Sequence, residues 1–200
     1  MLNEQQLAAL TRLFGRGSED ASEALSRWLG RPARVAISQI EEVPLAEAAE
    51  MLGDPELPVC FCAMSLRGTL TGELILATND ASGQALADLL LGRPTGTSNT
   101  WGEVEISAAL ETANIIGCAY LNALAPLMPE GSELLPSPPR FARDFAESLM
   151  EFALMSQATV SDTVFLTRTE FQIAESPVDC NLLLVPDPES VLILEGMLAK

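Results

Sequence analysis

Apolar and polar residues follow two different spacings along this chain. Segments in which apolar residues recur every three or four positions predict helices, and short apolar runs bounded by Gly, Pro or Asn predict strands. In the first half we expect helix 4–28, strand 33–42, helix 45–52, strands 58–67 and 70–78, and helix 81–91. In the second half we expect helix 102–127, strand 132–135, helix 142–157, strands 162–173 and 178–186, and helix 188–198.

Both halves therefore have the order helix, strand, helix, strand, strand, helix. The likeness extends to single positions, since the apolar residues 74–77 match the apolar residues 182–185 at an offset of 108. We predict one domain of two repeats related by a pseudo-twofold axis, residues 1–92 and 101–200, with a linker at 93–100. Two consecutive strands in each half predict hairpins, and hence an α+β fold whose mostly antiparallel sheet is flanked by long helices.

The composition is that of a compact, acidic protein. Of 200 residues, 48% are hydrophobic and 20% are charged, which is enough apolar material for a buried core. Lys and Arg number 11 against 28 Asp and Glu, and the net charge of −17 disfavours nucleic acid and anionic lipid as partners. No apolar run approaches the roughly 18 residues of a membrane span, and the first residues lack the pattern of an export signal. We therefore expect a cytoplasmic protein.

Histidine is absent, which removes the side chain most used for proton transfer near neutral pH, most zinc sites and every nucleophile that is paired with histidine. The four cysteines, Cys60, Cys62, Cys118 and Cys180, form no CxxC pair and are expected to be buried, reduced thiols. A phosphatase with its own metal or its own nucleophilic cysteine is therefore disfavoured.

The predicted helix 102–127 carries the strongest candidate for function. It is nearly all apolar between residues 106 and 124, yet polar residues interrupt it at Glu103, Ser107, Glu111, Asn114 and Asn122. At about 100° per residue, Glu111 lies about 40° and Asn114 about −20° from Ser107 around the helix axis. The spacing predicts one narrow polar stripe on a helix that is otherwise buried.

This stripe has two interpretations. Any helix that lies on a sheet needs a solvated face, which accounts for polar residues without a function. The stripe, however, has no base, whereas a face selected for solubility more often carries Lys-Glu pairs. A carboxamide can orient a water molecule, and a carboxylate can bind a partner's lysine. This chemistry suits the hydrolysis of a bond that is already labile.

Residues 105–117 resemble the signature helix of the CheC/CheX/FliY chemotaxis phosphatases. The family pattern is Asp or Ser, three residues, Glu, two residues and Asn, which Ser107, Glu111 and Asn114 match position for position. The family also has a proline some two dozen residues later. That spacing falls on Ser137, which lies between Pro136 and the pair that follows it at 138–139. The resemblance covers nearly the whole chain.

The resemblance implies a phosphatase that hydrolyses the phospho-aspartate of a CheY-like response regulator. In that mechanism Asn114 aligns the attacking water, Glu111 binds the lysine that contacts the phosphate, and Ser107 binds at the edge of the interface. The chain then needs no cofactor of its own, because Mg²⁺ is bound by the receiver. A CheD-like deamidase and a second copy of the chain remain open as further partners.

The first helix departs from the pattern. When residues 24–26 are aligned with residues 123–125, the three site positions hold Ala8, Arg12 and Gly15. Arginine reverses the charge that receives a lysine, and glycine has no side chain to hold water, so we predict that the first site is inactive. The alternative from another class is a non-catalytic module, either a flagellar switch component or a scaffold, that binds the receiver without changing the lifetime of its phosphate.

Overall fold

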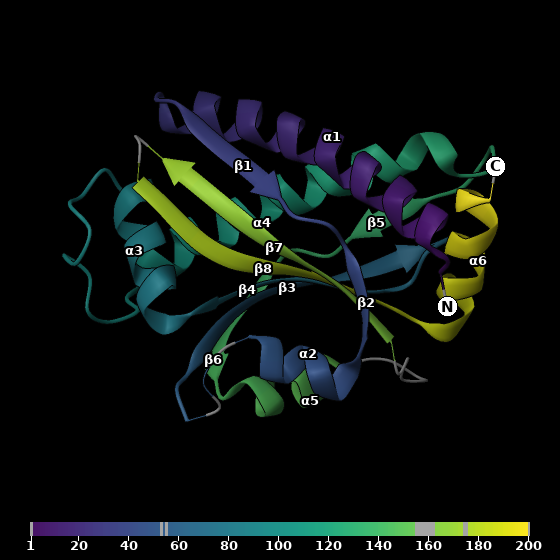
Figure 1. Ribbon diagram of the computed structural model, residues 1–200. Coiled ribbons are helices and arrows are strands. Elements are labelled where there is room, and N and C mark those ends of the chain that lie inside the picture. Colours follow the sequence, from purple (N-terminus) through teal and green to yellow (C-terminus); the bar gives the residue numbers. More distant parts are fainter. Residues whose placement is uncertain (1, 53, 55, 155–162, 174–175, 200) are drawn as a thin grey trace.

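A computed structural model describes residues 2–52, 54, 56–154, 163–173 and 176–199. It shows a strongly curled antiparallel sheet with helices on both faces (Figure 1). The helices are α1 (Glu4–Leu29), α2 (Leu45–Met51), α3 (Asp80–Leu90), α4 (Glu103–Leu124), α5 (Ala146–Leu154) and α6 (Pro188–Leu198). The strands are β1 (Ala33–Ile37), β2 (Glu41–Pro44), β3 (Val59–Gly68), β4 (Gly72–Asn79), β5 (Leu134–Pro136), β6 (Arg140–Asp144), β7 (Thr163–Ile173) and β8 (Ser176–Pro186). The α+β prediction is confirmed.

The strand order in the sheet is β1-β7-β8-β4-β3-β5, with β2 beside β7 and β6 beside β3. The central strands are apolar on both faces. In β4, Leu74 and Leu76 belong to the larger core under α1 and α4, whereas Ile75 and Ala77 belong to a smaller core with α2 and α5. Because successive side chains point to opposite faces, a strand covered on both sides has an unbroken apolar sequence.

Helices α1 and α4 lie side by side and run in opposite directions across one face of the sheet (Figure 1). Tyr120 of α4 is fully buried between them, where its ring stacks on Phe14 with centroids 4.9 Å apart. Its hydroxyl is 2.9 Å from the Ser18 hydroxyl, and Gly17 leaves room for the ring. No described helix has both the length and the apolar content needed to cross a bilayer.

Local signals at the helix ends agree with the sequence. Asn3 caps α1 by accepting a hydrogen bond from the Gln6 backbone, and the Gln6 side chain accepts one from the Asn3 backbone. Gly30 ends the same helix in the left-handed conformation at φ 65°. Asn79 caps α3 by accepting from the backbone of Ser82 at 2.8 Å.

The single strand expected over 33–42 is two strands. After β1 the backbone N–H of Ser38 still donates to the carbonyl of Arg168, but the N–H of Ile40 turns to the Thr11 hydroxyl of α1 at 3.1 Å. The Ile40 side chain is buried in the core. A contact with a distant helix therefore interrupts the pairing with β7, which resumes in β2.

The helix expected over 142–157 begins later. Residues Arg140–Asp144 form β6, which pairs with the edge of β3 in the register Ala63↔Arg140 to Val59↔Asp144. Helix α5 follows at Ala146, and residues 155–157 of the expected helix lie outside the described residues. The pairing with β3 outweighs local helix propensity in this segment.

The segment predicted as a linker is held in place by a buried carboxylate. Asp88 of α3 is fully buried and accepts hydrogen bonds from the backbone N–H groups of Thr97 and Ser98 and from the Ser98 hydroxyl, at 2.6–3.1 Å. Arg93 forms an ion pair with Glu105 in the first turn of α4. The turn-rich sequence between α3 and α4 is thus attached to both helices.

Candidate functional site

Helix α4 presents the predicted polar stripe on its outer face. Ser107 and Glu111 are exposed, and Asn114 is half-buried one turn further along. The opposite side of the helix is in the core, with Thr112, Ala113 and neighbouring apolar residues buried. The helical spacing of the sequence therefore places the three side chains together and away from the interior, as predicted.

The polar groups of the stripe have few partners in the part of the chain that the structure describes. The Ser107 hydroxyl and the Glu111 carboxylate have no side-chain hydrogen bond or ion pair there. The Asn114 carboxamide has one hydrogen bond, which its Oδ1 accepts from the Cys118 Sγ at 3.7 Å. The Asn114 Nδ2 group is thus available as a hydrogen-bond donor, and the Glu111 carboxylate is available to form an ion pair with a cation. This arrangement can position water and bind a lysine, but it contains no activated nucleophile.

The helix that carries the stripe is packed closely on the sheet. Gly117 lets α4 approach β3, because a Cβ at this position would collide with the Met64 methyl group and lie 3.3 Å from Leu74. Ile116 and Tyr120 anchor the next turn in the core. A side chain on such a helix is held more precisely than one on a loop.

A hollow of about 300 Å³ lies beside the last turns of α4. It is lined by Cys118 and Asn122 of the helix and, across from them, by Leu134 and Pro136 of β5. Pro136 belongs to the proline-rich segment expected downstream of the signature helix, and the structure places it next to the turn that follows Asn114. The resemblance predicts a proline in this segment, and the structure places Pro136 across the hollow from Cys118 and Asn122 of α4.

The cysteine prediction is only partly confirmed. All four cysteines are free thiols, and Cys60, Cys62 and Cys180 are buried. Burial raises the pKa of the Cys62 thiol to about 12. Cys118 is half-exposed on the polar stripe, so the expectation of burial was wrong there. The physical reason is its position four residues after Asn114, which puts both side chains on one helix face.

A polar cluster that the sequence does not predict holds the start of α4 in place. Asp80 at the start of α3 accepts hydrogen bonds from two nitrogens of Arg143, Nε at 2.7 Å and Nη2 at 2.9 Å, and a 2.8 Å hydrogen bond from the Trp101 indole. The Trp101 ring also packs against Phe141, with centroids 4.7 Å apart. These contacts join three elements at the residue that precedes α4 by two positions. No local motif indicates them, because the partners are far apart in sequence.

This cluster makes folding stability depend on pH. The hydrogen bonds from Arg143 and then Trp101 lower the pKa of Asp80 to about 2, against the opposing effect of partial burial. A carboxyl whose pKa is lowered in the folded state stabilises the protein fully above its unfolded pKa, and this stabilisation is lost as the pH falls through the folded pKa.

We expect Asp80→Asn to lower the free energy of unfolding by about 1–2 kcal/mol at pH 7 and by about half of that at pH 3. Urea unfolding of both proteins at the two pH values measures the difference. An equal difference at pH 7 and pH 3 would show that the ionised carboxylate is not the source of the effect.

The structure also shows the corresponding positions of the first helix. Arg12 is exposed on α1, Ala8 and Gly15 are half-buried, and no atom lies within 4 Å of a Cβ placed on Gly15. The structure thus shows room for a larger side chain at position 15. Whether the first site is inactive stays a prediction.

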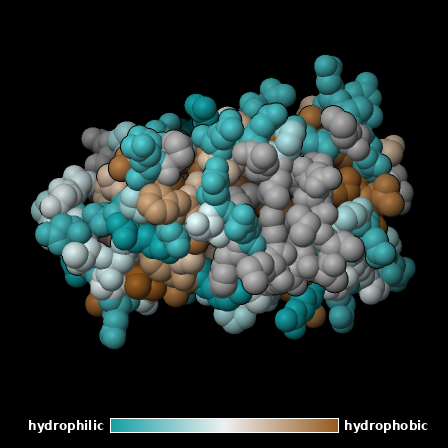
Figure 2. Space-filling view, turned by 90° about the horizontal axis from the view of Figure 1, so that it is seen from below, coloured by the Kyte–Doolittle hydropathy of each residue, from teal (hydrophilic) through white to brown (hydrophobic). Residues whose placement is uncertain are grey.

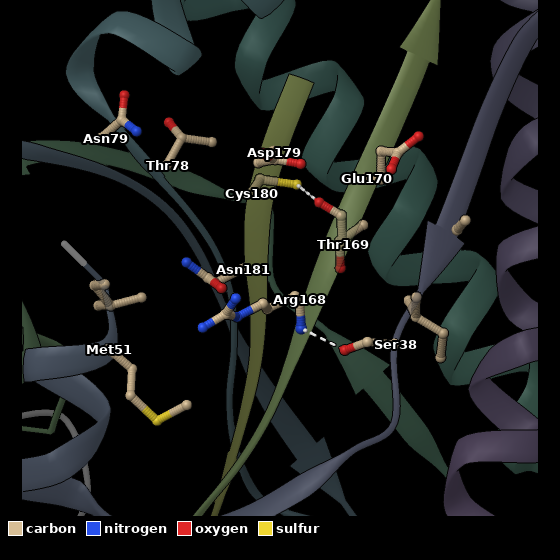
Figure 3. A pocket seen from close by; sticks show the side chains of 13 residues that line it. Ser38, Met51, Thr78, Asn79, Arg168, Thr169, Glu170, Asp179, Cys180 and Asn181 are labelled. Atoms are coloured by element: carbon tan, nitrogen blue, oxygen red, sulfur yellow. Dashed lines mark hydrogen bonds between the residues drawn. The ribbon is translucent and has the colours of Figure 1, made fainter. Parts of the chain in front are cut away.

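Another hollow, of about 530 Å³, lies on the part of the sheet that α2 and α5 leave uncovered (Figure 3). Arg168 extends toward Asn181 on the neighbouring strand, and its backbone N–H donates to the Ser38 hydroxyl at 3.2 Å. Glu170 and Asp179 face each other across β7 and β8. Charges of both signs line this shallow surface, and they do not form the constellation that the sequence predicts on α4.

A further hollow, of about 510 Å³, lies between α2 and α5 and is bordered by the exposed Phe145 ring and by Glu50, Glu56 and Glu147. Figure 2 views the molecule from this side and shows hydrophobic residues toward both its left and right ends, among hydrophilic ones. The residues that line this hollow include neither an amide that could orient water nor a cation, so α4 remains the candidate site.

The whole chain has the same architecture as proteins of known structure. No family model matches the sequence. FliY from Thermotoga maritima superposes with a TM-score of 0.79 at 16% identity, covering 100% of this chain and 98% of that chain. The FliM middle domain from H. pylori superposes with a TM-score of 0.69 at 14% identity, covering 99% of each chain. A chain of the CheX-CheY-BeF3-Mg²⁺ complex from Borrelia burgdorferi superposes with a TM-score of 0.50 at 13% identity, covering 86% of this chain and 96% of that chain.

At identities this low, the superpositions establish the fold and leave the activity open. The superpositions on FliY and on the FliM middle domain cover nearly all of both chains. The likeness therefore extends to the full order of helices and strands and is not limited to one motif. This chain has the CheC/CheX/FliY-type fold.

Proposed function

We propose that this protein accelerates hydrolysis of the phospho-aspartate of a CheY-like response regulator. The observation that carries the proposal is the stripe of exposed Ser107 and Glu111 and half-buried Asn114 on a helix whose opposite side is buried in the core. A fold shared with CheX, which is known in complex with CheY, BeF3 and Mg²⁺, supports the choice of partner. The family spacing of the three residues supports the choice of reaction.

In the proposed reaction the stripe docks over the phosphorylated aspartate of the receiver. The Asn114 amide positions a water molecule for in-line attack on phosphorus, the bond between phosphorus and the aspartyl oxygen breaks, and the free carboxylate and inorganic phosphate are released. Mg²⁺ held by the receiver supplies charge neutralisation. Because the acyl phosphate is already labile, a well-placed water accounts for the acceleration without a nucleophile on this chain.

Docking needs local attraction. A protein of net charge −17 is repelled on average by the acidic pocket of a receiver. In the proposed complex the Glu111 carboxylate, which has no partner among the described residues, binds the receiver lysine that contacts the phosphate. Ser107, one turn earlier, lies at the edge of this contact and is a candidate for a further hydrogen bond.

The direct test is the decay of a radiolabelled phospho-receiver with and without this protein. The proposal expects faster decay that is catalytic, so that a small molar fraction of this protein clears the whole receiver pool. Tight binding with an unchanged decay rate would reject the phosphatase and support the alternative below.

Reversing the charge of the docking residue tests the pose. We expect Glu111→Lys to raise KM about tenfold or more, because an attractive contact with lysine becomes repulsive. The measurement is the decay rate against receiver concentration. Glu151→Lys, which makes the same change at an exposed position of α5, is the matched control and should leave KM nearly unchanged. Equal effects of the two variants would mean that only net charge matters.

The alternative is a non-catalytic module that binds the phosphorylated receiver as a flagellar switch component or a scaffold. One observation favours it: the chain superposes better on the FliM middle domain, a protein also solved in complex with FliG, than on the CheX chain, with TM-scores of 0.69 and 0.50. The Arg12 and Gly15 positions of the first helix are compatible with it, since one of the two sites already lacks the required groups. The decay assay separates the alternatives, because only a phosphatase shortens the lifetime of the phosphate.

A further inference from the structure

Cys118 contacts the residue that the proposed reaction depends on most. Its Sγ lies 3.7 Å from Oδ1 of Asn114, one helical turn earlier, within the range of a thiol hydrogen bond. Burial, and to a smaller degree the charge of Glu111, raises the pKa of the Cys118 thiol, so the group is protonated at neutral pH and can donate. Within the described residues this is the only hydrogen bond of the Asn114 side chain.

The orientation of a carboxamide decides what it offers to a neighbouring molecule. The terminal torsion of asparagine has a broad energy profile, so an unrestrained amide exchanges its oxygen and nitrogen between two positions. A thiol that donates to Oδ1 favours the orientation in which this oxygen points along the helix toward Cys118. The Nδ2 group then points away from Cys118, toward the open side of the stripe.

We propose that Cys118 is a positioning residue that fixes the Asn114 carboxamide for water alignment. The proposal rests on the proposed function, since it concerns the same site. Two features of the structure support it. Cys118 is the half-exposed thiol of the four, four residues after Asn114 on the same helix face, and it also lines the hollow beside β5.

The test compares two substitutions at this position. Cys118→Ala removes the donor, and Cys118→Ser keeps one. Thiol hydrogen bonds are weak, so we expect Cys118→Ala to lower kcat for receiver dephosphorylation about two- to fivefold with KM unchanged. Cys118→Ser should retain most of kcat. An unchanged kcat in Cys118→Ala, an effect on KM alone, or an equal loss in both variants would overturn the proposal.

Cys180→Ala is the matched control. Its buried thiol also donates to a carbonyl oxygen, that of Thr169 at 3.3 Å, but on β8 away from the stripe. We expect a loss of stability and no change in kcat. A loss of kcat equal to that of Cys118→Ala would mean that any lost thiol contact has this effect, and would overturn the proposal.

A second readout does not require turnover. In an NMR spectrum of the ¹⁵N-labelled protein, the side-chain NH2 signals of Asn114 should shift in Cys118→Ala and stay in place in Cys180→Ala. Unshifted signals would overturn the positioning role. If Asn114→Ala fails to slow dephosphorylation while these signals do shift, the role of Asn114 in the proposed function is wrong and the contact itself is right. If Asn114→Ala slows the reaction and Cys118→Ala does not, only the positioning role is wrong.

Discussion

Asn114→Ala is expected to lower the catalysed rate of receiver dephosphorylation about ten- to a thousandfold while receiver binding stays nearly unchanged. The substitution deletes the amide that would hold the attacking water, and leaves Glu111 and Ser107 in place for docking. Alanine has the higher helix propensity, and among the described residues the Asn114 side chain has only the weak hydrogen bond with Cys118, so the fold should not suffer. Single-turnover decay of the phospho-receiver measures the rate, and titration with a receiver carrying BeF3 measures binding.

Asn122→Ala is the matched control for this result. Asn122 is exposed two turns further along the same stripe and loses the same group. Its distance from Glu111 places it outside the predicted family pattern, so we expect a change of less than twofold. Decay that is equally fast with wild type and with Asn114→Ala would reject water positioning by this chain. Equal losses of rate in both variants would show that the effect is not specific to Asn114, and would also reject water positioning by its amide.

Helical periodicity was sufficient to predict the stripe. Ser107, Glu111 and Asn114 are set by one local rule, the 3.6-residue period, and a helix buried on the opposite side leaves only one direction for them. The α+β class was predictable for a similar reason, since alternation, apolar runs and turn residues are read within a few positions of each other.

Contacts between distant segments were not predictable in this way. Arg140–Asp144 form a strand because the edge of β3 is available to them, and nothing within the segment indicates that partner. The ion pair of Asp80 with Arg143 joins residues 63 positions apart. The exposure of Cys118, in contrast, could have been found, because its spacing of four from Asn114 assigns it to the same face. The general preference of cysteine for burial does not outweigh that spacing on a helix with a solvent-facing stripe.

Two glycines of α1 make the packing of the two long helices testable. A helix interior normally gains about 0.5–1 kcal/mol when glycine becomes alanine, because the unfolded chain loses freedom. Gly17→Ala should nevertheless destabilise the protein, by about 1–3 kcal/mol. Its Cβ would lie 2.5 Å from Cδ1 of Tyr120 and 3.0 Å from the Tyr120 Cα, and a backbone atom cannot turn aside as a flexible side chain can. Helix α4, which carries the stripe, would have to move away from α1.

Gly15→Ala on the same helix is expected to have the opposite sign. No atom lies within 4 Å of its added Cβ, so only the propensity gain remains, and the free energy of unfolding should rise by about 0.5–1 kcal/mol. Urea unfolding of the two variants against wild type measures both effects with the same chemical change two residues apart. If Gly17→Ala stabilised the protein as Gly15→Ala does, α1 and α4 would not be in close contact at Tyr120. The support for the stripe would then have to come from the sheet alone, through Gly117 and Met64.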